Sequence, residues 1–228
     1  MSDKNIQALG EKRAKEYAYR LSKAPEQYQK LFAMYKDKVE IANDIYEPKE
    51  FNYFDPIDKK IHLMESVFKR LPHQKEYDLV YHEVAHAIDD LGKISGKEEF
   101  VLDRTLHQEV VDGVEKYLSL HYPNLKNTNR ESVTFKISLD NGIFSEENVI
   151  RTGNIADIYD GLTKLGLSFG HDLGYFDVKG KLGSEFFAET VSTAINNSEA
   201  YEFQKVIAPK STKIVDEMIR EILENEKS

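Results

Sequence analysis

The pentapeptide His82-Glu-Val-Ala-His86 is the feature that most restricts how this chain can fold. Two histidines four positions apart lie one turn apart on the same side of an α-helix, so both imidazoles can reach one metal ion. Glu83 then lies beside the ion without binding it, where it can take a proton from a metal-bound water molecule. The pentapeptide therefore predicts a helix that carries two metal ligands and a general base.

The residues around the pentapeptide favour this helix, which we place from about Lys75 to Leu91. Gly92 follows as a typical helix stop. Apolar residues recur at helical spacing on the face opposite the histidines, and they are Val80, Val84, Ala87, Ile88 and Leu91.

A third metal ligand must be a histidine or a carboxylate, because the chain has no cysteine. Such a ligand set suits a single catalytic Zn²⁺ ion better than a structural one. The best candidates are Glu185 and Glu189, one turn apart on a helix that Ser184 would cap. One carboxylate could bind the metal while the other holds a histidine in place. Alternatively, both are acids favoured near a helix N-terminus by the macrodipole.

Asp89 and Asp90 follow His86 by three and four residues. Each could bind the metal, support a ligand from behind, or simply face solvent. We interpret both as groups that hold the ligands by hydrogen bonds.

The rest of the chain predicts an α+β fold that is mainly helical and has a small sheet. We expect a helical extension over residues 1–40 and a second domain over residues 41–228. The run Lys60–Met64 alternates like a strand, and Val133–Phe144 reads as a hairpin with its turn at residues 140–142. Helices are expected at Lys4–Lys23, from Pro25 to Val39, and at Lys97–His121, Ile155–Lys164, Ser184–Asn197, Ser198–Ala208 and Ser211–Glu226.

The charge pattern narrows the classes of partner. The net charge is −9 and basic residues are interspersed with acidic ones, which argues against nucleic acid or an anionic membrane. No apolar run has membrane-spanning length, and the charged N-terminus lacks the apolar core of a signal peptide. We expect a cytoplasmic protein, or one released without a recognisable signal peptide, that acts on a protein or peptide. The sequence does not indicate an oligomeric state.

Two segments together resemble a known family. The pair HEVAHAIDD, from His82, and EFFAETV, from Glu185, is similar to the C-terminal catalytic domain of anthrax lethal factor and its bacterial relatives. The resemblance implies a zincin-like metallopeptidase domain. It also implies that His82, His86 and Glu185 bind the zinc ion, with Glu189 behind the site.

A second resemblance covers a longer stretch. The segments Ile155–Thr163, Gly170–Tyr175 and Glu185–Glu189 resemble the peptidase-like domain of phage head-morphogenesis (minor capsid) proteins. Together the two resemblances cover about residues 78–225, and they imply an association with phages or mobile elements. His171 is then either a group that contacts substrate or a ligand, which we favour, or a loop histidine without a role.

The chain departs from the lethal-factor pattern at one position. That family uses a tyrosine shortly before the third ligand to stabilise the oxyanion, but Val178 stands seven residues before Glu185. Tyr175 is the nearest substitute, and the glycine-rich stretch 179–183 could let it move over the metal. The alternative is a packing aromatic.

We therefore expect a zinc-dependent endopeptidase that cleaves a peptide bond through a metal-bound water, with Glu83 as general base and Tyr175 on the oxyanion. The substrate would bind along an edge strand around Ile61–Met64. One alternative is a catalytically silent binding or structural module of the same fold. Another is an interaction protein whose N-terminal helices bind the partner while the metal stabilises the fold.

Overall fold

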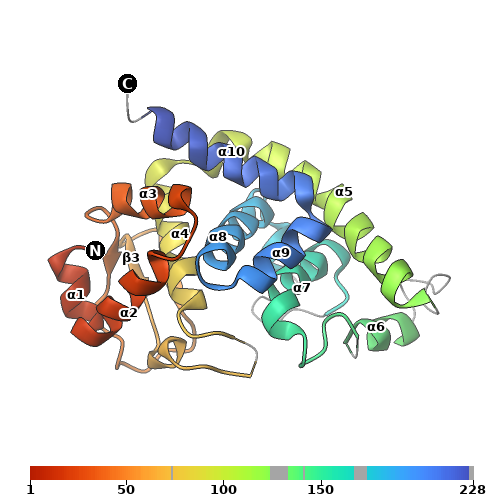
Figure 1. Cartoon of the computed structure of the whole chain (residues 1–228), viewed down its shortest axis with the longest axis horizontal. Helices are drawn as coiled ribbons and strands as arrows, with labels where there is room; N and C mark the ends of the chain where they lie inside the picture. Colours follow the sequence, from red (N-terminus) through yellow and green to blue (C-terminus); the bar gives the residue numbers. More distant parts are fainter. Residues whose placement is uncertain (73, 124–132, 141, 167–173, 226–228) are drawn as a thin grey trace.

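The computed structural model describes residues 1–72, 74–123, 133–140, 142–166 and 174–225 (Figure 1). Within these residues the fold is mainly helical, with one small sheet. In chain order the helices are α1 (Asp3–Leu9), α2 (Glu11–Leu21), α3 (Glu26–Tyr35), α4 (Asp78–Gly92), α5 (Ser95–His121), α6 (Val133–Asp140), α7 (Val149–Thr163), α8 (Lys181–Asn196), α9 (Ser198–Ile207) and α10 (Pro209–Asn225). This confirms the mainly helical α+β class.

The small sheet lies beside α4 and has the strand order β1-β3-β2. The strands are β1 (Glu40–Ile41), β2 (Tyr53–Asp55) and β3 (Lys60–His62). β1 runs parallel to β3, and β2 runs antiparallel to it. The predicted strand at residues 60–64 is therefore present, but it occupies the centre of the sheet. The expectation that Ile61–Met64 forms the edge for substrate is wrong, since β2 is the edge strand that contacts α4.

The predicted hairpin at Val133–Phe144 is also wrong, because residues 133–140 form the helix α6. Its alternating β-branched residues favour a strand, but burial follows helical spacing. Phe135 and Leu139 are four residues apart and both are buried, and Ile143 continues the series. Packing of this face against the core outweighs local β-propensity. Residue 141, inside the predicted turn, lies outside the described residues.

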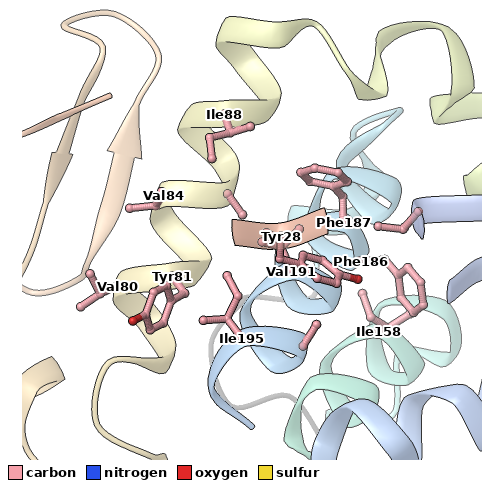
Figure 2. Close-up of a cluster of buried hydrophobic side chains, with 14 of the residues drawn as sticks. Tyr28, Val80, Tyr81, Val84, Ile88, Ile158, Phe186, Phe187, Val191 and Ile195 are labelled. Carbon is pink, nitrogen blue, oxygen red and sulfur yellow. The ribbon is translucent and has the colours of Figure 1, made fainter. Parts of the chain in front are cut away.

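The hydrophobic core surrounds α4 and α8, which lie side by side (Figure 2). α4 is placed between the sheet on one side and α8 on the other, and Val84 points toward the strands. From α8, Phe187 and Val191 are fully buried and Ile195 is nearly so. Because the two helices that carry the candidate ligands share one core, their relative position is fixed by close packing.

The N-terminal helices are packed into this same core. The ring of Tyr17 on α2 stacks on Tyr81 of α4, with centroids 4.7 Å apart, and the Tyr81 hydroxyl donates to the Tyr17 carbonyl at 2.6 Å. Tyr28 on α3 is fully buried and binds Asp216 of α10 at 2.7 Å. Residues 1–40 thus support the ligand helix from behind.

Several predicted helix boundaries differ from those observed. Helix α7 begins at Val149 rather than Ile155, and α3 ends at Tyr35 rather than Val39. Gly10 divides the expected helix at Lys4–Lys23, because its φ of 79° interrupts the helical backbone. Helix α8 begins at Lys181, after Gly180 with φ of 87°, so Ser184 lies inside the helix and does not cap it. α4 includes Gly92 and ends where Lys93 takes the left-handed conformation.

No helix in the described part of the chain is both long and apolar enough to cross a membrane.

Candidate metal centre

Three potential ligand atoms converge between α4 and α8. Nε2 of His82 and Nε2 of His86 are 3.0 Å apart. Each imidazole also faces Glu185: His82 Nε2 lies 3.3 Å from Oε2, and His86 Nε2 lies 3.3 Å from Oε1. The structure thus brings together the three residues that the sequence and the resemblance indicated as metal ligands.

The spacing of these atoms fits a small metal ion. Zinc bonds of about 2.0–2.1 Å in tetrahedral geometry place two ligand atoms about 3.3 Å apart. The two Nε2 atoms are 3.0 Å apart, and each lies 3.3 Å from a different oxygen of Glu185, so all three distances are close to that edge length. Two imidazoles and one carboxylate also leave the fourth tetrahedral position open, as in catalytic zinc sites. The donor set and its dimensions therefore suit a catalytic Zn²⁺ ion.

The site is buried and rich in negative charge. His82 and Glu185 are 6% and 3% exposed. Glu189, one turn after Glu185, places Oε1 3.3 Å from Nδ1 of His82, on the side of the ring away from the other ligands. Burial lowers the pKa of His82, but Glu189 and Glu185 outweigh it and raise that pKa well above its ordinary value. The surrounding carboxylates thus favour positive charge at this position, whether a proton or a metal ion supplies it.

Glu83 is buried beside the triad but does not belong to it. Its Oε2 accepts a hydrogen bond of 2.9 Å from the backbone N–H of Phe54 on β2. This N–H lies on the side of the edge strand that faces α4, away from β3. The sheet edge therefore holds the Glu83 carboxylate in place.

Tyr175 reaches the ligands from outside the two helices. It lies in the short 3₁₀ helix η3 (Tyr175–Asp177), and its hydroxyl donates a hydrogen bond to Oε1 of Glu185. Burial and the negative charge of Glu185 raise the pKa of Tyr175, so the phenol keeps its proton. The ammonium of Lys181 lies 3.4 Å from the hydroxyl and 5.0 Å from the ring centre. Tyr175 is thus a protonated donor at the ligand cluster.

Ser184 was expected to be a helix cap, and the structure gives it a different environment. Its hydroxyl donates to Oδ2 of Asp89 at 3.2 Å and lies 3.4 Å from Nδ1 of His86. Asp89 is buried, at 6% exposed, and thus connects to the back of His86 through Ser184. The sequence could not reveal this contact, since it joins residues 98 positions apart.

The structure does not bring Asp90 to the cluster. Asp90 is oriented away and forms an ion pair with Lys59 at 2.9 Å. Its place on α4 explains this, because the next residue of a helix points about 100° away from Asp89. His171 lies outside the described residues.

A second group of potential ligands lies at the β2–β3 connection and was not indicated by the sequence. It contains Asp55, Asp58 and His62. Both ring nitrogens of His62 already face carboxylates, with Asp44 at 2.7 Å and Asp58 at 3.1 Å. We interpret this group as an ion-paired histidine that fastens the sheet to the preceding loop.

A cavity of about 470 Å³ opens beside the triad. His82, Glu83 and Glu189 form part of its wall. The remainder comes from the start of α4, from α7, α8 and α9, from residues 50–52, and from Met64, Ser66, Leu71 and Gln74. The candidate metal centre is therefore accessible to a ligand of considerable size.

Searches against protein-family models, curated proteins and solved structures find no significant match.

Proposed function

We propose that this protein is a zinc-dependent endopeptidase with a zincin-like catalytic domain. The observation that carries the proposal is the position of Glu83 beside a ligand triad of zinc-site dimensions, at the edge of the sheet. A metal ligand set alone would serve a structural site. A buried carboxylate next to it, held toward an edge strand, adds the base that hydrolysis requires.

Each residue at the site has a separate role in the proposed hydrolysis. His82, His86 and Glu185 would hold the ion, and bound zinc would act as a Lewis acid toward a peptide carbonyl and a water molecule. Glu83 accepts the proton of the attacking water and returns it to the leaving amine. The protonated hydroxyl of Tyr175 donates to Glu185 in this structure. During hydrolysis it can donate instead to the oxyanion that develops on the peptide carbonyl.

The supporting residues fix the orientation of the ligands. The carboxylate of Glu189, with Oε1 3.3 Å from Nδ1 of His82, favours a proton on Nδ1, which would leave Nε2 free for the metal. Edge strand β2 borders the site on the side away from β3, and an extended peptide would run alongside it. A peptide bound in this way would have its scissile bond beside Glu83.

Replacement of Glu83 by Gln tests the proposal. Gln keeps the size and one acceptor oxygen but cannot take a proton, so proteolysis of a denatured protein substrate should fall below detection. Zinc content should remain near one per chain, because Glu83 does not belong to the triad. The zinc-loaded wild type must cleave under the same conditions.

Two outcomes would contradict the proposal. Undiminished cleavage by the Glu83→Gln protein would remove Glu83 from the chemistry. A wild type that binds stoichiometric zinc but cleaves none of a broad peptide library would favour the silent binding module instead.

A further inference from the structure

The cavity beside the triad is far larger than the proposed hydrolysis requires. At about 470 Å³ it falls within the range of pockets that enclose small ligands. Only His82, Glu83 and Glu189 on its wall take part in the proposed chemistry. The other residues that line the cavity therefore point to a further part of the ligand that the cavity binds.

Apart from His82, the ionisable side chains on the cavity wall are all carboxylic acids. Its carboxylates come from residues on the loop before β2, on α4, on α7 and on α8, and they are Glu50, Asp78, Glu83, Asp157 and Glu189. Among the described residues that line the cavity there is neither lysine nor arginine. Lys75 is close by, but its ammonium is bound to Oδ1 of Asn197 at 2.9 Å. The cavity is therefore an environment for a cation.

Two buried polar atoms on the wall also lack partners within the described part of the chain. Asn154 donates to Gln204 at 2.8 Å through Nδ2, but its Oδ1 accepts no hydrogen bond. Nε2 of Gln74 is a donor without an acceptor. Both atoms belong to residues of the cavity wall, and no described group supplies the hydrogen bond that each could make.

Asp78 gives independent support for the electrostatic character of the cavity. Its removal from water raises its pKa to about 6, and the nearby charge of Glu189 acts in the same direction. The carboxylate of Asp78 is thus poorly solvated, and a cation bound in the cavity would favour its ionised form.

From this cavity beside the candidate metal centre and its acidic wall, we propose that the protein binds a lysine or arginine side chain of its substrate at a residue next to the scissile bond. The inference rests on the proposed peptidase function, because it identifies the cavity as a subsite of that reaction. Gly153 on α7 leaves room for such a side chain. A Cβ added there would have only Val149 within 4 Å, so a larger residue would project into the cavity.

The first experiment maps cleavage sites. The zinc-loaded full chain is incubated with a random peptide library, and the products are sequenced by mass spectrometry. We expect lysine and arginine to be enriched at one fixed position beside the cut. Cleavage without such enrichment would overturn the subsite while leaving the peptidase assignment intact. Failure to cleave any peptide would overturn both.

Variants then connect the preference to the cavity. Glu50→Gln and Asp157→Asn each remove one charge from the wall, and each should reduce kcat/KM for the preferred basic peptide about tenfold. Glu47→Gln is the matched control, since Glu47 is exposed three residues earlier on the same loop and does not line the cavity. Equal loss with a norleucine peptide would contradict the proposal, because norleucine carries no charge.

A binding measurement separates the subsite from turnover and from folding. In the Glu83→Gln background, calorimetry compares peptides that differ only by lysine or norleucine at the mapped position. We expect at least tenfold tighter binding of the lysine peptide, and we expect Gly153→Leu to abolish this difference by filling the cavity. Equal affinities of the two peptides would overturn the proposal.

Discussion

The backbone N–H of Phe54 donates a hydrogen bond of 2.9 Å to Oε2 of Glu83. This bond joins the edge strand β2 to the helix that carries two of the three candidate ligands. A carboxylate held by a charge-assisted hydrogen bond is fixed in direction, and a general base must be aimed at the water that it deprotonates. The sheet therefore contributes to the site although it supplies none of the ligands.

Removal of this N–H should impair catalysis more than removal of the Phe54 side chain. Phe54→Pro lacks the donor, and proline is tolerated on edge strands at positions that do not bond to the neighbouring strand. We expect kcat of Phe54→Pro to be about tenfold or more below that of Phe54→Ala, because a hydrogen bond to a charged group contributes about 1.5–3 kcal/mol. Equal kcat values in the two variants would show that the bond has no catalytic effect.

The two glutamates of α8 should differ in their effect on the metal. Glu185→Ala removes a ligand and should leave the purified protein almost without zinc. Glu189→Gln removes only the negative charge beside His82 Nδ1, and zinc affinity should fall about 10- to 100-fold. Elemental analysis and titration against a chelator measure the two effects. The exposed Glu199→Gln on α9 is the control and should retain wild-type zinc affinity.

Tyr175→Phe should lower kcat while leaving zinc content unchanged. Loss of one oxyanion donor typically lowers kcat about 10²–10³-fold, and KM should change little because the ring remains. Steady-state kinetics separate the two parameters. A reduced zinc content in this variant would instead show that the hydroxyl serves mainly to hold Glu185, to which it is bonded in this structure.

His62 should make the free energy of unfolding depend on pH. Burial lowers the pKa of His62, but the carboxylates of Asp44 and Asp58 outweigh it and raise that pKa above 6.5. The native state then holds a proton that the unfolded state releases. The stabilisation is complete below about pH 6.5 and is lost as pH rises through the folded-state pKa.

Chemical denaturation at several pH values checks this expectation. In the wild type, the free energy of unfolding should decline as pH rises above about 6.5. His62→Gln should lack this part of the decline. His107→Gln, at an exposed position on α5, should behave like the wild type. If the His62→Gln and wild-type curves are parallel over this range, the ion pairs do not contribute to stability.

Gly113 should be sensitive to any side chain. A Cβ at this position of α5 would lie 2.1 Å from the backbone oxygen of Ile207 on α9. Backbone cannot give way as a flexible side chain can, so Gly113→Ala should lower the free energy of unfolding by about 1–3 kcal/mol. Gly153→Ala is the matched control, since its Cβ meets only Val149 at 3.4 Å and helix propensity favours alanine by about 1 kcal/mol.

Much of the ligand set could be predicted because it depends on local geometry. His82 and His86 are one helical turn apart wherever that helix is placed, and Glu185 and Glu189 are related in the same way. The convergence of the two pairs could not be calculated from spacing, because it depends on how α4 packs against α8. For Glu185, only the resemblance to known peptidases indicated that it would meet the two histidines.

Other features depended on contacts between distant segments. Local propensity favoured a hairpin at Val133–Phe144, yet Phe135 and Leu139 pack on the core as successive turns of a helix. Ser184 looked like a cap, but the helix begins three residues earlier and its hydroxyl meets Asp89. No pattern along the chain encodes which surface a segment will meet.

The sequence by itself determined the mainly helical class, the α4 helix with its paired histidines, and the limitation to nitrogen and oxygen ligands that follows from the absence of cysteine. These depend on residue identity and on a period of 3.6, both of which are local. Only the tertiary structure decided that β2 forms the edge beside Glu83, that Tyr175 touches Glu185, and that five carboxylates line one cavity. These relations join separate elements of the chain, and only the packing of those elements on a shared core sets them.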